Sequence, residues 1–317
     1  MEGGIQAMTS KTKYPVTDAQ VRAMFQKADL GDVRSVKPMS DGWYNNVLGV
    51  TAGAGEYVVK IAPGPQARVL THEADLLRQE LRFLALLRER TDVRVPQVFF
   101  SDLSKTLIPC DYFIMEKLSG VRLDKANLKG DLRAQTDAQI EGILGAFHGI
   151  AGEGFGYEQM GLAPNWHQAL RAMARALVGD CAAFGKRCPM GERLLRCVDL
   201  HRELLEPVPS VLVNFDLHSM NLFYQGGALT VIDLERCFWG DWVGGCVLRH
   251  TRAPAGFSRE EQIRFYLLEA YLAVTMYTEK YSRYSPWNVT WWADVAGSWY
   301  FWLNSYPALR RLQKHKK

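Results

Sequence analysis

The segment VLVNFDLHSMNLFY, residues 211–224, sets the strongest constraint on the fold of this chain. Two apolar runs flank a polar loop, and Asp216 and Asn221 lie five positions apart in that loop. Twelve residues after Asn221, Asp233 ends another apolar run, residues 229–232. Short runs of this kind are typical of strands. We therefore expect a loop between two strands, followed by a third strand that ends in a carboxylate.

Phosphoryl transfer needs these residue types. A carboxylate must lie near the acceptor hydroxyl, and Mg²⁺ prefers hard oxygen ligands, of which the protein supplies few. The catalytic loop of protein kinases has the same Asp-x-x-x-x-Asn spacing, followed by a metal-binding Asp. We predict that Asp216 orients or deprotonates the hydroxyl and that Asn221 and Asp233 bind Mg²⁺. The alternative is a solvated turn, but the flanking strands favour a site.

A lysine suited to holding phosphates lies upstream, in the apolar run of residues 57–61. Lys60 would be costly there unless its amine reached a partner, and a kinase pairs a strand lysine with a helix glutamate. The alternative is an edge-strand lysine that faces water. Leucines at intervals of three and four predict a helix over residues 71–90, which carries Glu73 and Glu80. Glu80 lies in the more periodic part, so we predict that it pairs with Lys60.

The polar segment of residues 40–46 lies between two predicted strands. Its backbone N–H groups could cover phosphates, with Ser40, Gly42 and Asn45 as the candidate nucleotide-binding residues. A full phosphate loop has three glycines and this segment has one, so an ordinary hairpin turn is the alternative.

The first third of the chain is predicted to be mainly strand and the rest mainly helix. A capping box, Thr17 with Gln20, opens a helix that we expect to stop near Gly31. The predicted strands cover residues 33–39, 47–51, 56–61, 97–100 and 112–115. The predicted helices of the second part cover residues 136–150, 166–178, 192–205, 258–282 and 287–306, with a β section over 211–232. The change in character falls near residues 116–120.

Composition and charge exclude several classes. Hydrophobic residues make up 48% and charged residues 23% of the 317, a globular balance. The net charge of +4 is spread along the chain, so we expect no nucleic-acid partner. The six cysteines form no C-x-x-C pair, which favours free, buried thiols. We see neither a signal-peptide pattern nor a span of about 20 apolar residues, so we expect a cytoplasmic protein with no membrane partner. The oligomeric state stays open.

Together these motifs resemble the aminoglycoside phosphotransferase family, over roughly residues 33–241. The family's catalytic loop reads H-G-D-L-H-x-x-N, and residues 214–221 read NFDLHSMN. Its metal strand reads I-D-[FW]-E followed by G-D, and residues 232–235 read IDLE, with GD at 240–241. The family's V-P-x-V strand is matched by VPQV at 95–98, which also aligns Glu80 with the lysine-pairing glutamate.

The resemblance implies an α+β, bilobal, protein-kinase-like fold, with a small antiparallel-sheet N-lobe and a larger helical C-lobe. The implied lobes are residues 1–115, with the N-terminal helix and the nucleotide site, and 121–317, with the catalytic loop and acceptor pocket. Residues 116–120 would form the hinge, where the backbone of Glu116 and Leu118 would meet the adenine. The implied activity is transfer of the ATP γ-phosphate, with Mg²⁺, to a small-molecule hydroxyl; GTP is the alternative nucleotide.

One departure from the family pattern supports a second hypothesis. Asn214 and Phe215 stand where the family has His and Gly. A catalytically silent, ligand-binding regulator would tolerate that change. Such a protein would have no physical need for the full set that this chain retains. That set comprises Lys60, Glu80, Asp216, Asn221 and Asp233.

The charge of the last part of the chain bears on the acceptor. From residue 241 onward there are six acidic residues and eleven basic ones, together with a cluster of tyrosines and tryptophans over residues 277–302. A pocket for polycationic aminoglycosides would present several carboxylates. Aromatic side chains stack on sugars and nucleobases, although any single one is more often part of a core. We therefore expect a neutral acceptor such as a sugar, a macrolide or a nucleoside, with antibiotics among the candidates.

Overall fold

The N-terminal part of the chain is built on one antiparallel sheet. The computed structural model describes residues 10–39 and 44–314. The five strands follow the order β1-β2-β3-β5-β4, and every neighbouring pair is antiparallel. Their bounds are β1 Val33–Pro38, β2 Asn46–Ala52, β3 Gly55–Ile61, β4 Val98–Asp102 and β5 Tyr112–Glu116. The strands predicted from the sequence are all present, within two residues at each end.

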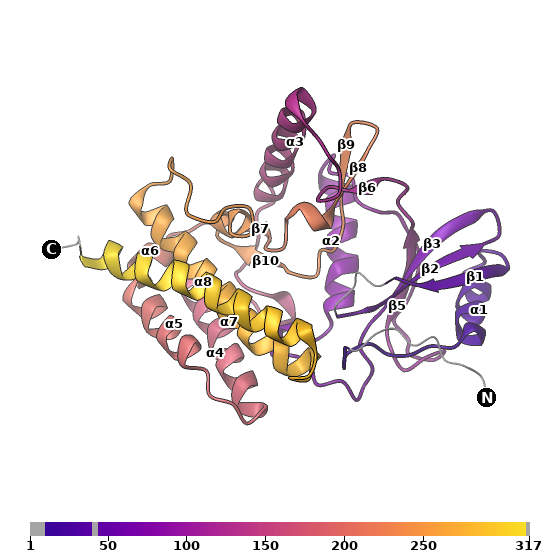
Figure 1. Cartoon of the computed structure of the whole chain (residues 1–317), viewed down its shortest axis with the longest axis horizontal. Coiled ribbons are helices and arrows are strands. Elements are labelled where there is room, and N and C mark those ends of the chain that lie inside the picture. Colours follow the sequence, from indigo (N-terminus) through magenta and orange to yellow (C-terminus); the bar gives the residue numbers. More distant parts are fainter. Residues whose placement is uncertain (1–9, 40–43, 315–317) are drawn as a thin grey trace.

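Helix α1 (Asp18–Lys27) packs against one face of this sheet (Figure 1). The predicted capping box is confirmed: the Thr17 side chain accepts the Gln20 N–H at 3.2 Å, and the Gln20 side chain accepts the Thr17 N–H at 2.9 Å. The helix ends at Lys27, before the expected stop at Gly31. Burial alternates along β2, because one face of the strand packs against the apolar face of α1.

The prediction of one long helix over residues 71–90 is wrong in one respect, because the structure divides this segment into two helices. A short 3₁₀ helix, η1 (Thr71–Glu73), is followed by Asp75 in the left-handed conformation (φ 54°), and α2 proper runs over Leu76–Arg90. Aspartate tolerates this conformation better than most residues. Glu73 and Glu80 therefore lie on different elements and face different partners.

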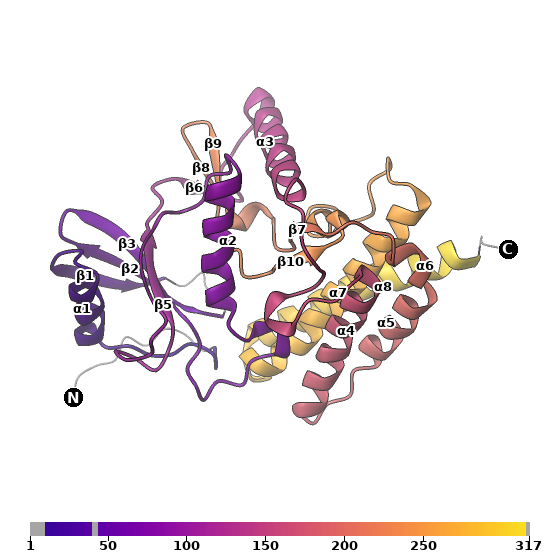
Figure 2. The same ribbon diagram turned by 180° about the vertical axis from the view of Figure 1, so that it is seen from behind.

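The C-terminal part is mainly helical, as predicted, with several helices longer than the sequence pattern showed. Its helices are α3 Gly130–His148, α4 Trp166–Ala183, α5 Pro189–Leu200, α6 Arg202–Leu205, α7 Arg259–Arg283 and α8 Val289–Lys314, with the 3₁₀ turns η2 Glu158–Met160, η3 Ser219–Asn221 and η4 Trp242–Cys246. Figure 2 shows α2 between the sheet and this helical part. The predicted fold class is confirmed. The lobe boundary at residues 116–120 stays a prediction.

Two small sheets hold the loop that the sequence singled out. Strands β8 (Leu222–Gln225) and β9 (Ala228–Val231) form a hairpin that pairs with β6 (Val121–Arg122). Strand β7 (Val211–Asn214) pairs with β10 (Cys237–Gly240), a strand that the sequence analysis did not expect. The loop between β7 and β8 therefore lies beside the loop between β9 and β10.

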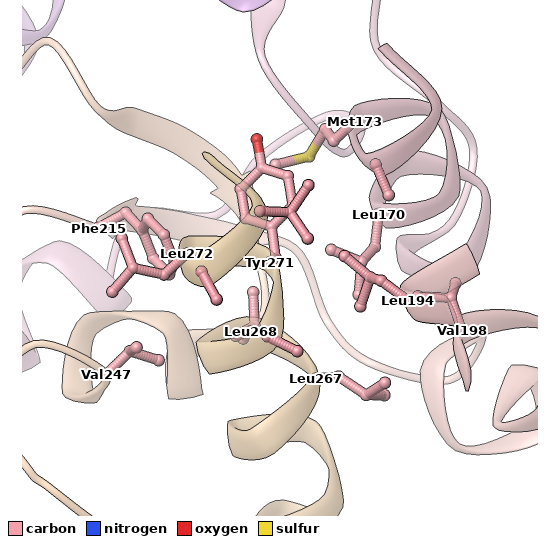
Figure 3. Close-up of a cluster of buried hydrophobic side chains, with 14 of the residues drawn as sticks. Leu170, Met173, Leu194, Val198, Phe215, Val247, Leu267, Leu268, Tyr271 and Leu272 are labelled. Atoms are coloured by element: carbon pink, nitrogen blue, oxygen red, sulfur yellow. The ribbon is translucent and has the colours of Figure 1, made fainter. Parts of the chain in front are cut away.

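The main core of the C-terminal part lies between α4, α5 and α7 and reaches the β7 loop (Figure 3). Phe215, from that loop, packs against Tyr271 of α7 with ring centroids 5.9 Å apart. All six cysteines are free and buried, as predicted. Within residues 10–39 and 44–314, no helix is both long and apolar enough to cross a membrane.

Candidate active site

The loop after β7 is closed by its own polar side chains. The Asn214 Oδ1 accepts the backbone N–H of Asp216 at 3.0 Å. The Asn221 Nδ2 donates to the Asp216 carbonyl oxygen at 3.0 Å and to its Oδ2 at 3.2 Å. Asn214 and Asn221 are both buried, so these bonds fix the position of Asp216 without help from solvent.

The two residues that depart from the family pattern are well accommodated. Asn214 supplies an acceptor oxygen to the loop, and Phe215 is buried in the core below it. Burial of a full aromatic side chain anchors the loop to α7. The substitution therefore leaves the loop supported by other contacts and gives no structural reason for a silent protein.

A cation that the sequence analysis overlooked faces Asp216. The Arg236 Nη1 lies 4.0 Å from the Asp216 Oδ1, and the His218 Nε2 lies 3.5 Å from the same oxygen. Burial alone would raise the pKa of Asp216, but the charge of Arg236 and bonds from His218 and Asn221 lower it to about 2. Asp216 is therefore ionised at any physiological pH.

Arg236 is itself held by α7. Its Nη2 donates to both carboxylate oxygens of Glu279, at 2.7 and 2.9 Å. Arg283, one turn further along α7, contacts Glu279 at 3.1 Å and Glu73 of η1 at 2.7 Å. Four alternating charges thus connect the loop around Asp216 to the segment before α2. Sequence spacing could have suggested the pair Glu279 and Arg283, but not their partners.

Lys60 of β3 lies at the centre of a second cluster. Its Nζ lies 2.7 Å from Glu80 Oε2, 3.0 Å from Asp233 Oδ1 and 2.6 Å from Glu235 Oε1. These carboxylates come from α2 and from the loop after β9. The predicted pairing of Lys60 with Glu80 is present, and the structure adds Glu235, which the sequence analysis had used only as part of a motif.

The electrostatics of this cluster follow from its uneven charge. Burial alone would lower the pKa of Lys60, but the three carboxylates raise it well above the usual value. Burial and the neighbouring Asp233 raise the pKa of Glu235 to about 8. One ammonium group does not balance three carboxylates, so the cluster favours a further cation.

The donor set fits Mg²⁺. Carboxylate oxygens of Glu80, Asp233 and Glu235 lie within 4.8 Å of one another. Ile232 N–H donates to the Asn221 carbonyl at 3.0 Å, which brings Asn221 beside Asp233. Because the Asn221 Nδ2 is directed at Asp216, its Oδ1 is the atom left for a metal. These are the hard oxygen ligands that Mg²⁺ prefers.

A second group of potential ligands does not need a metal. His72, Glu73 and Glu279 also offer ligand atoms within 4.8 Å of one another. Arg283 contacts both of these carboxylates and Arg236 contacts Glu279, so two cations already balance two anions. We therefore interpret this group as a structural ion network.

The structure describes some of the remaining predicted nucleotide-binding residues and not others. Asn45 donates from its Nδ2 to Glu235 Oε1, which places the end of the 40–46 turn against the Lys60 cluster. Ser40 and Gly42 lie outside the described residues. The Glu116 N–H donates to the Gln97 carbonyl at 2.8 Å, and the contact of Glu116 with a base stays a prediction. Leu118 follows in the connection after β5.

Comparison with known proteins gives one family and one fold. Residues 35–272 match the sequence model of the phosphotransferase enzyme family. No curated protein matches the chain. A crystal structure from Ralstonia eutropha JMP134, provisionally named an aminoglycoside phosphotransferase, is 14% identical with a TM-score of 0.61, and the match covers 90% of this chain and 97% of that one.

Two further solved structures have a similar fold. One, provisionally named fructosamine-3-kinase from Haemophilus somnus 129PT, is 14% identical with a TM-score of 0.57, over 92% of this chain and 96% of that one. A thermostable mutant of the aminoglycoside phosphotransferase APH(4)-Ia, in a ternary complex with AMP-PNP and hygromycin B, is 14% identical with a TM-score of 0.59, over 92% and 98%. At this identity they show the fold alone.

Proposed function

The chain belongs to the phosphotransferase enzyme family, and from that premise we propose that it transfers the γ-phosphate of ATP to a hydroxyl group of a small molecule. One observation carries the proposal. Lys60 joins carboxylates from α2 and from the loop after β9, and the neighbouring strand places Asn221 between this cluster and Asp216. Nucleotide, metal and acceptor groups would thus meet at one place.

On the nucleotide side, we assign Lys60 to the α- and β-phosphates. Glu80 holds the ammonium group at 2.7 Å, so that it is already oriented when a nucleotide binds. Asn45 lies beside the cluster, and its turn would cover the phosphates together with Ser40 and Gly42. The backbone of Glu116 and Leu118 would contact the base. The AMP-PNP complex of a structural neighbour supports ATP, with GTP as the alternative.

On the metal side, we assign Asn221 Oδ1 and Asp233 as ligands of Mg²⁺. Bound Mg²⁺ would neutralise phosphate charge that Lys60 alone cannot balance. Asp233 has φ 62°. Aspartate tolerates this left-handed conformation better than most residues, as it does at Asp75.

We assign Asp216 to the acceptor. In the transfer, the acceptor oxygen forms a bond to the γ-phosphorus, the bond from that phosphorus to the β–γ bridging oxygen breaks, and the hydroxyl proton passes to the Asp216 carboxylate. A carboxyl group with a pKa of about 2 is a weak base. Asp216 would therefore act mainly by orienting the hydroxyl, and proton transfer would come late in the reaction.

For the acceptor we propose a neutral compound such as a sugar, a macrolide or a nucleoside. Of the six acids from residue 241 onward, Asp241 pairs with Arg264 at 2.9 Å and Glu279 pairs with Arg236 and Arg283. These two carboxylates are already neutralised, and basic residues outnumber acidic ones in this segment, which disfavours a polycation. Several aromatics have other roles, because Tyr277, Tyr281 and Trp291 surround the Lys280 ammonium group.

The test is ATP consumption with Mg²⁺ against a panel of hydroxylated compounds, with the product identified by mass spectrometry. Acceptor-dependent ADP release and a phosphorylated product are expected. Tight nucleotide binding with no turnover on any acceptor would favour the silent regulator instead. The cytoplasm is the compartment we propose, since ATP and free thiols are maintained there.

A further inference from the structure

The last helix exposes an apolar stripe to solvent. On α8, the side chains of Val289, Trp292, Trp299, Tyr300 and Leu303 are between 48% and 81% exposed. Trp287, just before the helix, is 96% exposed. Scattered single apolar residues on a surface need no explanation, but a contiguous set of this size marks an interaction site.

These residues share one face of the helix. At about 100° per residue, the exposed positions from Val289 to Leu303 fall within an arc of roughly 120°. Ala293 and Ala296 are exposed within the same arc, and Pro307 extends it. The one acidic residue of α8, Asp294, lies outside the arc. Figure 1 shows α8 in front of α7, with no described segment over its outer side.

The same face becomes basic at its C-terminal end. Arg310 and Arg311 are exposed and fall within the arc. Tryptophan and tyrosine prefer the boundary between water and hydrocarbon, and arginine and lysine are attracted to anionic headgroups.

We propose that this face of α8 binds to the surface of a membrane that contains anionic lipids. The tryptophans, Tyr300 and Leu303 would enter the interfacial layer, and the arginines would contact lipid phosphates and carboxylates. The expectation of no membrane partner came from the lack of a spanning segment, which a helix lying on the surface does not need. This inference is independent of the catalytic proposal.

A second copy of the chain is the competing occupant, and the size of the face argues against it. From Val289 to Arg311 the helix extends about 33 Å, and a helix is about 10–12 Å wide, so the face covers roughly 330–400 Å². A stable interface needs about 800 Å² from each partner. A fluid bilayer can close around a single ridge, whereas a rigid copy would need a matching groove.

The experiment is co-sedimentation of the full chain with vesicles of phosphatidylcholine alone or mixed with phosphatidylserine. We expect binding to the mixed vesicles that weakens at high salt. The triple variant Trp292→Gln, Trp299→Gln and Leu303→Gln should lower the partition coefficient by at least about tenfold. The pair Arg310→Gln and Arg311→Gln should mainly remove the preference for phosphatidylserine.

The matched control changes exposed apolar residues elsewhere, Phe99→Gln and Leu200→Gln, and should bind as the wild type does. Circular dichroism would verify that each variant folds. If the wild type does not sediment with mixed vesicles, or if the control loses as much binding as the triple variant, the proposal is wrong. A dimer by light scattering that the triple variant abolishes, without vesicle binding, would assign the face to a second copy. Neither result would affect the phosphotransferase proposal, which is tested by turnover in the absence of lipid.

Discussion

The side-chain oxygen of Asn214 accepts the backbone N–H of Asp216 at 3.0 Å. The residue that departs from the family pattern therefore holds the backbone of the proposed catalytic aspartate. The Asn214 Nδ2 is buried and has no hydrogen-bond partner among the described residues, so the Asn214 side chain supports the loop through its oxygen.

We expect Asn214→Ala to lower kcat by roughly tenfold or more, because a misplaced catalytic group costs rate steeply. The KM for ATP should stay nearly constant, since the phosphates are held elsewhere. Asn214→His, which installs the family's residue, is the matched comparison and should retain more activity. Steady-state kinetics with the identified acceptor would check both; an alanine variant with unchanged kcat would show that the bond is dispensable.

Replacing Lys60 should affect stability and activity separately. Lys60→Met leaves three neighbouring carboxylates without their cation and should cost roughly 3–5 kcal/mol of unfolding free energy. Adding Glu80→Gln removes one of those charges and should recover part of the loss in urea denaturation. Activity should remain low in both variants because the phosphate ligand is missing. Recovery of turnover in the double variant would contradict the role of Lys60.

Replacing Asp216 and replacing Asp233 should have different kinds of effect on the reaction. Asp216→Asn should leave nucleotide binding nearly intact while kcat falls by roughly a hundredfold or more. Asp233→Asn should also weaken Mg²⁺–nucleotide binding, because it removes a charge from the metal ligands. Titration calorimetry with AMP-PNP and Mg²⁺, together with kinetics, separates the two. Near wild-type transfer by Asp216→Asn would remove the core of the mechanism.

Glu269, buried in α7, should make stability depend on pH. Burial raises its pKa to about 7, against a bond from Asn304 Nδ2 at 2.8 Å that favours the charged form. An unfolded Glu titrates near 4.3, so between about 4.3 and 7 the folded chain holds a proton that the unfolded chain has lost. This contribution to the unfolding free energy falls as pH rises through that window.

Glu269→Gln keeps the shape without the charge. We expect it to raise the unfolding free energy at pH 8 by on the order of 2 kcal/mol, and to change it little near pH 4. The exposed Glu89→Gln is the control and should change it by less than about 0.5 kcal/mol at both values. Equal stability of Glu269→Gln and wild type at pH 8 would show that the carboxylate is well solvated.

The acceptor proposal predicts poor turnover of kanamycin-like polycations and better turnover of neutral sugars, macrolides or nucleosides. The comparison is kcat/KM across matched series at two ionic strengths, since attraction of a polycation to carboxylates would weaken with salt. Efficient, salt-sensitive phosphorylation of several aminoglycosides would show that the pocket carries charges that we assigned to ion pairs.

Local patterns predicted most of the elements, though not β10, and one of the central contacts. The position of Lys60 in an apolar run and of Glu80 on a periodic helix was sufficient to predict that they pair. A buried lysine needs a carboxylate partner, and few carboxylates were near. The contacts of Arg236 with Glu279, and of Arg283 with Glu73, join residues 43 and 210 positions apart. Their identity depends on how α7 packs, which no local pattern records. The break at Asp75 was missed because the leucines that predicted the helix all lie after it, over residues 76–87, and gave no information on where the helix begins.

The alternating charges of Glu73, Arg283, Glu279 and Arg236 also constrain how the sequence can change over time. Any single neutral replacement leaves a buried charge uncompensated, whereas a paired replacement does not. We expect strong epistasis along this chain of contacts: substitutions that are deleterious alone become tolerated together. In a deep mutational scan, the pair Glu73 and Arg283 should accept joint changes to apolar residues more readily than either change alone.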